Sequence, residues 1–273
     1  MDTQSLRRLL ASMIREDVGA IDLSSQIIPS KKAKAKVTSN QEGVICGLSE
    51  AMELASLYDI APRAHVFDGD SIKPGQDILT LTGQSRDILF VERTLLNLLS
   101  LMSGIATKTK KYVEKTAPTK VAATRKTHPL LRFFEKKAVV CAGGLSHRMG
   151  LFDLVMLKDN HLKFFEDVRE AVVLARSQNP YHKVEVEVLN PPQAITAAEA
   201  GADIIMLDNM SLQKVAQTNK LLTEKGLRKD VLLEASGGIT MENAAEYACC
   251  GVDIISTSDL TYAAYLDFTL NIL

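Results

Sequence analysis

The chain has 273 residues, which is enough for one large domain or two of moderate size. Its hydrophobic share of 46% and charged share of 24% are ordinary for a globular protein. The 32 Lys and Arg residues are balanced by 33 Asp and Glu residues, which argues against a general nucleic-acid surface because that requires excess positive charge. No uncharged apolar run reaches the roughly 18 residues of a membrane span, and the N-terminal segment lacks the apolar core and cleavage site of a signal peptide.

The first 90 residues mix short elements of both kinds. Residues 1–17 have the pattern of an amphipathic helix, and the alternation of Ala and Val with Lys in residues 32–40 predicts a half-buried strand. Residues 43–58 turn into a helix, and residues 65–83 form short strands interrupted by glycine turns. This last stretch leaves open a lipoyl-type carrier with Lys73 as the modified lysine, although the flanking methionines of such carriers are missing.

From residue 120 onward, short apolar runs alternate with stretches of helical spacing. Repeated strand-helix units with strands rich in Val and Ile predict a parallel sheet covered by helices. Six such units, with a seventh that the pattern does not place, favour a closed barrel over an open doubly wound sheet. The six candidate strands are residues 121–124, 154–158, 183–189, 203–207, 231–236 and 252–256.

Polar residues follow nearly every one of these strands. The carboxyl ends of the strands of such a barrel meet on one face, where active sites lie, so these residues predict a shared site. They are Arg125 and Lys126, Lys158 to His161, Asp208 and Asn209, Glu234 with Ser236 to Gly238, and Ser256 to Ser258.

The third strand carries two glutamates on one face. Glu185 and Glu187 alternate with the valines of residues 184–188, so both glutamates point into the barrel if the valines meet the helices. Glu187 and Asp208 could bind Mg²⁺, because a site of oxygen ligands suits magnesium better than zinc. A salt bridge from Glu187 to a neighbouring lysine is the structural alternative.

Two further segments suggest anionic ligands. His147 and Arg148 follow a pair of glycines and, together with Arg125 and Lys126, would form a cationic cluster that is tolerable only around an anion. The residues from Ser236 to Gly238 join a strand to a helical pattern, and the free N–H groups of such a turn cradle phosphate, although a plain tight turn is an equal alternative. Ser258, on the following loop, favours the phosphate.

The motifs in their order resemble the quinolinate phosphoribosyltransferase family over about residues 13 to 270. The resemblance rests on residues 15–25, 92–107, 121–139, 143–151, 156–162, 184–190, 202–211, 233–240 and 252–261. It implies an α/β fold with an N-terminal α/β sandwich of residues 1–104, joined by a C-terminal strand at 265–273, and a seven-stranded α/β barrel of residues 105–264. It also implies a cytoplasmic homodimer that uses Mg²⁺ to join quinolinate to phosphoribosyl pyrophosphate, releasing pyrophosphate and CO₂ and giving nicotinate mononucleotide for NAD synthesis.

The resemblance further implies roles for individual residues. Arg125, His147 and Arg148 match the cations that bind quinolinate, and Arg93 matches an arginine supplied by the neighbouring subunit. Lys126 and Lys158 match lysines near both substrates, where with Glu187 and Asp208 they form the catalytic set. Glu187 and Asp208 match the acids near ribose and magnesium, and Ser236, Gly237, Gly238 and Ser258 match the 5′-phosphate loops.

The sequence departs from the family pattern at a few positions. Ser258 and Tyr262 stand where the family often has Gly and His, which leaves the details of phosphate contact open, and Leu130, Ala142 and Ser146 are also atypical. A paralogue linked to molybdenum uptake is the nearest alternative, but it lacks the run LKDNH that is intact here at 157–161. A non-catalytic barrel that binds a phosphorylated metabolite is the more distant alternative.

The four cysteines have no metal-like spacing, and we expect them to be reduced thiols.

Overall fold

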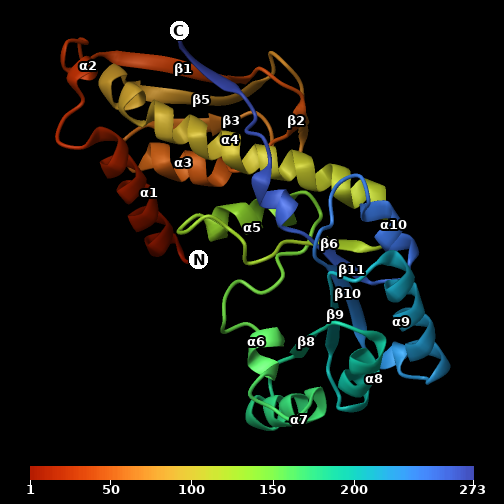
Figure 1. Cartoon of the computed structure of the whole chain (residues 1–273). Helices are drawn as coiled ribbons and strands as arrows, with labels where there is room; N and C mark the ends of the chain where they lie inside the picture. Colours follow the sequence, from red (N-terminus) through yellow and green to blue (C-terminus); the bar gives the residue numbers. More distant parts are fainter. The chain divides into compact units, whose positions relative to one another are not determined.

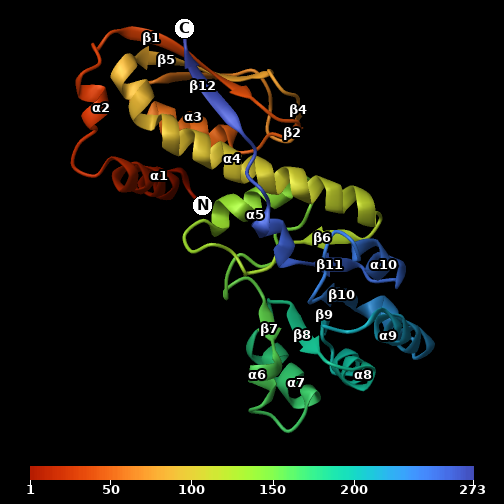
Figure 2. The ribbon, with the colours of Figure 1, turned by 45° about the horizontal axis from the view of Figure 1, so that its top comes forward.

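The computed structural model describes residues 1–273, which form two compact units. The first unit comprises Met1–Lys110, Phe133–Ala142 and Tyr262–Leu273, and the second comprises Lys111–Arg132 and Gly143–Thr261. Figures 1 and 2 show the elements of both units from two directions. The second unit contains all the strand ends that the sequence marked as a site.

The first unit is built on a four-stranded antiparallel sheet in the order β12-β1-β5-β3. The last strand of the chain pairs with β1, so that Val37 lies opposite Leu270, and the predicted alternation in β1 buries Ala35 and Val37 completely. The strands of this unit are β1 (Lys32–Ser39), β2 (Gly43–Val44), β3 (Ala61–Ala64), β4 (Ser71–Ile72), β5 (Asp77–Gln84) and β12 (Phe268–Ile272). A separate two-stranded pair is formed by β2 and β4.

The helices of the first unit pack beside this sheet, and Figures 1 and 2 show α3 and α4 along one of its faces. They are α1 (Thr3–Val18), α2 (Leu23–Gln26), α3 (Leu48–Ser56), α4 (Ser85–Thr116) and α5 (Arg132–Cys141), and residues 111–116 of α4 belong to the second unit. By length and composition, α4 is the single helix that could cross a membrane. Because 67% of its apolar window is buried inside the protein, α4 fits the role of a core helix.

The second unit is a parallel α/β structure with strand order β6-β11-β10-β9-β8-β7, which confirms the predicted fold class. Its strands are β6 (Lys120–Ala122), β7 (Val155–Leu157), β8 (Val184–Val188), β9 (Ile204–Asp208), β10 (Leu232–Ser236) and β11 (Ile254–Ser256). The seventh position that the sequence pattern did not place is a short parallel bridge between Ala122 and Leu145. This bridge brings the segment that precedes His147 against β6.

Helices connect the strands in the expected alternation. They are α6 (Asp159–Leu162), α7 (Val168–Gln178), α8 (Pro191–Glu199), α9 (Leu212–Glu224) and α10 (Ala244–Cys249), with 3₁₀ helices at Arg228–Asp230 and Ser258–Tyr262. The three valines of β8 are completely buried, which leaves Glu185 and Glu187 on the opposite face of the strand. The register places Ser236 beside both Asp208 and Ser256, so the carboxyl ends of β9, β10 and β11 lie together.

Candidate active site

A cavity of about 370 Å³ lies within the second unit at the carboxyl ends of its strands. It is lined by ten residues that the sequence predicted as site residues: Arg125, Lys126, His147, Arg148, Lys158, Glu187, Asp208, Ser236, Gly237 and Gly238. These residues come from six separate segments of the chain. The parallel strand order brings them to one place, because every strand ends at the same edge of the sheet.

Two predicted residues do not line this cavity. Ser258 begins the 3₁₀ helix Ser258–Tyr262, where its carbonyl accepts a hydrogen bond from Thr261 Oγ1 at 2.8 Å, and Ser256 at the end of β11 lines the cavity. Arg93 lies on α4 in the first unit, where it borders a different cavity of about 410 Å³ together with residues such as Asp22 and Glu92. The expected contribution of Arg93 from a neighbouring subunit stays a prediction.

The acidic wall of the cavity comes from β8 and β9. Glu187 is 9% exposed and forms an ion pair with Lys158, so the salt bridge considered from the sequence is present. Glu187 lies in register with Met206, two residues before Asp208, which places both carboxylates on the same face of neighbouring strands. Asp208 also accepts a hydrogen bond from Asn209 Nδ2 at 2.7 Å. Two carboxylates on one wall fit Mg²⁺, which commonly binds one or two carboxylates together with substrate phosphates.

The glycine turn after β10 is tightly constrained. Gly237 has a φ of +88°, and a Cβ atom at this position would lie 2.4 Å from Asn209 Oδ1, so only glycine fits. The side chain of Asn243 closes the turn by donating to the carbonyl of Gly238 at 3.0 Å. Helix α10 begins only at Ala244, later than the sequence pattern suggested, and therefore the turn itself faces the cavity rather than a helix N-terminus.

The cationic wall consists of Arg125, Lys126, His147 and Arg148, which lie on two loops of the second unit. Arg148 is only 7% exposed, and burial followed by the nearby Arg125 lowers the pKa of its guanidinium. Two arginines that repel each other in a partly buried place are stabilised when an anion binds between them. This wall is therefore suited to a ligand with several carboxylate or phosphate oxygens.

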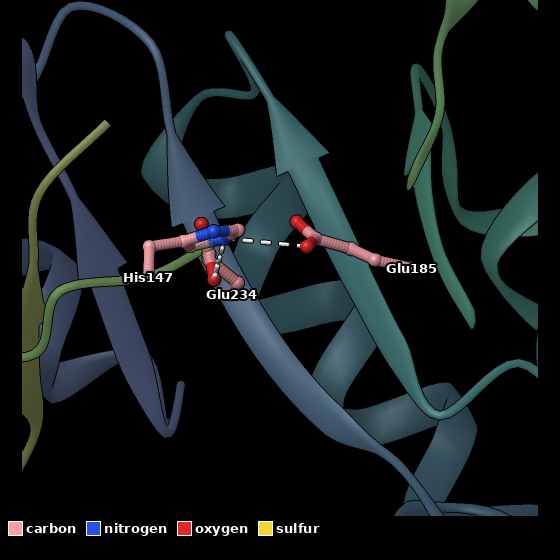
Figure 3. Close-up of side chains that lie close together, drawn as sticks. All are labelled: His147, Glu185 and Glu234. Carbon is pink, nitrogen blue, oxygen red and sulfur yellow. Dashed lines mark ion pairs between the residues drawn. The ribbon is translucent and has the colours of Figure 1, made fainter. Parts of the chain in front are cut away.

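His147 lies between two buried glutamates, Glu185 from β8 and Glu234 from β10 (Figure 3). Its Nε2 atom is 3.2 Å from Glu185 Oε2 and 3.5 Å from Glu234 Oε2. Burial alone lowers the pKa of His147, but the two carboxylates outweigh burial and raise the pKa to about 9. Burial also disfavours the charged form of Glu185 and so raises the pKa of this carboxyl group, while the nearby His147 lowers it.

The other ring nitrogen of His147 is also engaged. The backbone N–H of Arg148 points at Nδ1 at 2.7 Å, a contact that favours the neutral ring, whereas the carboxylates favour the charged one. The nearby carboxylates of Glu185 and Glu234 raise the pKa of His147 to about 9, so the charged imidazolium prevails at neutral pH. His147 thus adds positive charge to the cavity while both of its nitrogens face protein groups.

Some residues of the site had no individual role assigned from the sequence. Asn209 and Ser256, which were expected only as strand-end residues, line the cavity together with Thr124. Glu234 was likewise expected only as a charged residue near the end of the strand of residues 231–236, and it is completely buried. Its meaning depends on His147, which is distant in the sequence.

Comparisons with known proteins agree with this geometry. The family model described as "Quinolinate phosphoribosyl transferase, N-terminal domain" matches residues 20–103, and the model of the C-terminal domain of the same family matches residues 105–271. The first match includes the stretch around Lys73, which therefore belongs to that domain rather than to a lipoyl-type carrier.

Relatives match over nearly their whole length. The chain is 42% identical over 272 residues to the probable nicotinate-nucleotide pyrophosphorylase [carboxylating] of Methanothermobacter thermautotrophicus, covering 97% of this chain and 98% of the relative. It is 45% identical over 251 residues to the protein of the same description from Archaeoglobus fulgidus, covering 90% and 96%. Among solved structures, NadC from Streptococcus pyogenes superposes with a TM-score of 0.92 at 37% identity, covering 100% of this chain and 99% of that chain.

The ordered motifs, the two-part α/β fold, the cavity at the strand ends and the full-length matches all lead to the same assignment. This chain belongs to the quinolinate phosphoribosyltransferase family.

Proposed function

We propose that this protein transfers the phosphoribosyl group of phosphoribosyl pyrophosphate to quinolinate and releases CO₂, giving nicotinate mononucleotide for NAD synthesis. The observation that carries the proposal is a single cavity in which a cationic wall, an acidic pair and a glycine turn meet. These three features correspond to the three chemical parts of the reaction: a pyridine dicarboxylate, a ribose that develops positive charge, and a phosphate. The names of the relatives support the same activity.

The pyridine acid belongs at the cationic wall. Quinolinate has two carboxylates, and the guanidinium groups of Arg125 and Arg148 can each bind one of them in a bidentate manner. His147 adds a third positive charge at the same place. Binding of the dianion removes the repulsion between the cations and orients the ring nitrogen toward the ribose.

The sugar phosphate belongs at the opposite part of the cavity. The turn of Ser236, Gly237 and Gly238 exposes backbone N–H groups that suit the 5′-phosphate. Glu187 and Asp208 lie near the expected place of the ribose, where their negative charges stabilise the positive charge that develops at C1 as pyrophosphate departs. Lys158, which neutralises Glu187, and Lys126 are placed to approach the anionic groups of both substrates.

Bond formation explains the loss of CO₂. When the ring nitrogen attacks C1 of the ribose, the C1–O bond to pyrophosphate breaks and the nitrogen becomes positively charged. The adjacent carboxylate then leaves as CO₂, and its electron pair remains on the ring carbon next to N⁺ until a proton binds there. Glu187 and Asp208 are the residues that would hold Mg²⁺, which when bound would stabilise the negative charge of the leaving pyrophosphate.

The remaining features of the proposal concern the assembly and its place in the cell. The enzyme is proposed to be a cytoplasmic homodimer or a larger assembly of dimers, with Arg93 supplied to the active site of the partner. Support comes from the family resemblance of the helix that contains Arg93. Replacing Arg93 with Ala should then weaken quinolinate binding, and a normal KM for quinolinate would remove this part of the proposal.

The reaction itself can be tested directly. Purified protein is mixed with phosphoribosyl pyrophosphate, Mg²⁺ and quinolinate labelled at the carboxylate next to the nitrogen, and released CO₂ and pyrophosphate are measured. We expect both products in equal amounts, a strong loss of turnover when EDTA removes Mg²⁺, and little turnover with nicotinate, which lacks the second carboxylate. Binding of phosphoribosyl pyrophosphate without release of pyrophosphate would instead indicate a non-catalytic barrel.

A further inference from the structure

Glu185 and Glu234 do not line the cavity, yet both are completely buried directly beside a residue that does. None of their four carboxylate oxygens forms a hydrogen bond of good geometry with the protein. Their close polar contact is the ion pair with His147 Nε2, at 3.2 Å and 3.5 Å (Figure 3). Two buried carboxylates are costly for folding, so their placement at one imidazole nitrogen calls for a functional reason.

The backbone at His147 gives that reason. His147 has a φ of +50°, a left-handed conformation that is unfavourable for a residue with a side chain and persists only where its surroundings hold it. The ring is held at Nε2, which lies close to the carboxylates of both Glu185 and Glu234. The next residue, Arg148, is buried to 7% exposure in the cationic wall.

We propose that Glu185 and Glu234 are positioning residues for the pyridine-acid end of the site, which anchor the His147 ring and thereby fix the direction of Arg148. The two glutamates come from β8 and β10, separated in the sheet by β9, so two strands of one sheet hold the carboxylates that meet at Nε2 of the ring. This inference rests on the proposed assignment of His147 and Arg148 to quinolinate. It adds residues that act on the substrate only through His147.

The three side chains also have the spacing of a metal site, since their ligand atoms lie within 4.8 Å of one another. The surrounding charge argues against a bound cation, because Arg148 carries a positive charge that interacts with Glu185, and Arg125 is close to Arg148. A charged His147 ring gives the two carboxylates a nearby positive charge without a metal. Elemental analysis of the purified protein distinguishes the two: a stoichiometric transition metal that is lost in the variant H147N would overturn the inference.

The test uses isosteric substitutions that keep the volume of the buried groups. We expect E185Q/E234Q to raise the KM for quinolinate about tenfold or more, because the ion pairs that hold the His147 ring are lost. The KM for phosphoribosyl pyrophosphate and kcat should change less than about threefold, because the acidic pair and the glycine turn are untouched. E50Q is the matched control: Glu50 is also a buried carboxylate paired with one cation, Lys137, but it lies in the first unit and should affect only thermal stability.

A double-mutant cycle tests whether the glutamates act through His147. Asn tolerates the left-handed backbone, so H147N should fold, and adding E234Q to H147N should leave the KM for quinolinate within about twofold of H147N alone. Full additivity of the two effects would show that Glu234 acts by another route and would overturn the inference. The variant R148M separates this inference from the proposed function. If R148M raises the KM for quinolinate but E185Q/E234Q does not, the inference about the glutamates is overturned. If neither variant changes the KM, the proposed assignment of the cationic wall to quinolinate is wrong instead.

Discussion

Replacing Arg148 with Met tests the cationic wall most directly. The side chain is 7% exposed and loses its charge in this variant while most of its apolar stem is retained. Removing one partner of a buried, hydrogen-bonded charge pair costs about 2 to 5 kcal/mol of binding free energy. Loss of the repulsion between Arg125 and Arg148 in the free enzyme offsets part of this cost, since Arg125 lowers the pKa of Arg148. A cost near the lower end of this range, about 2 to 3 kcal/mol, corresponds to a change of about 30- to 150-fold.

The assay is steady-state formation of nicotinate mononucleotide with quinolinate varied at saturating phosphoribosyl pyrophosphate. We expect kcat/KM for quinolinate to fall about 30- to 150-fold, mostly through KM, while the KM for phosphoribosyl pyrophosphate changes less than about threefold. R228M is the control: Arg228 bonds to Asp253 at 2.8 Å and to the carbonyl of Val231 at 3.0 Å, and neither it nor these partners lines the cavity. R228M should therefore lower the melting temperature without changing either KM. An unchanged KM for quinolinate in a folded R148M protein would refute the reasoning.

Three other changes should have separable effects. G237A should raise the KM for phosphoribosyl pyrophosphate about tenfold, because left-handed backbone strain of about 1 to 2 kcal/mol adds to the steric contact of the new Cβ atom with Asn209. Initial rates at varied phosphoribosyl pyrophosphate measure this KM, and an unchanged value would exclude the turn as the phosphate site. The free energy of unfolding should fall by about 3 kcal/mol between pH 6.5 and pH 9, because the folded protein retains a proton on His147 that the unfolded chain releases. Urea titrations across this pH range should show the decline in the wild type and a flatter profile in H147N. Y112F removes the hydrogen bond to Asp259 at 2.7 Å and should lower the free energy of unfolding by about 1 to 2 kcal/mol in urea titrations, while an unchanged stability would show that this bond contributes nothing net.

Local patterns in the sequence were sufficient to predict much of the second unit. Strands recur every few tens of residues with strong Val and Ile content, so their positions and their parallel arrangement follow from periodicity. The alternation in β8 placed Glu185 and Glu187 on one face, and the structure agrees, because the intervening valines are completely buried. The cavity residues at the strand ends followed from the general geometry of parallel strands.

Other features depended on contacts that no local pattern contains. Ser258 was expected at the phosphate from its place on the loop after β11, but the chain turns into a 3₁₀ helix two residues after the strand ends, and Ser256 rather than Ser258 lines the cavity. The seventh strand position was missed because it is one bridge at Leu145, too short to produce a periodic signal.

The sequence by itself determined the strand-helix order, the inward face of β8 and the collection of charged residues at one end of the sheet, because these depend on residues close together in the chain. Only the tertiary structure decided that His147 lies between Glu185 and Glu234, and that Lys158 pairs with Glu187. The physical reason is that the energy of a buried charge depends on which opposite charge lies within a few ångströms of it. That distance is fixed by strand order and by loop packing, which join parts of the chain that are far apart in sequence.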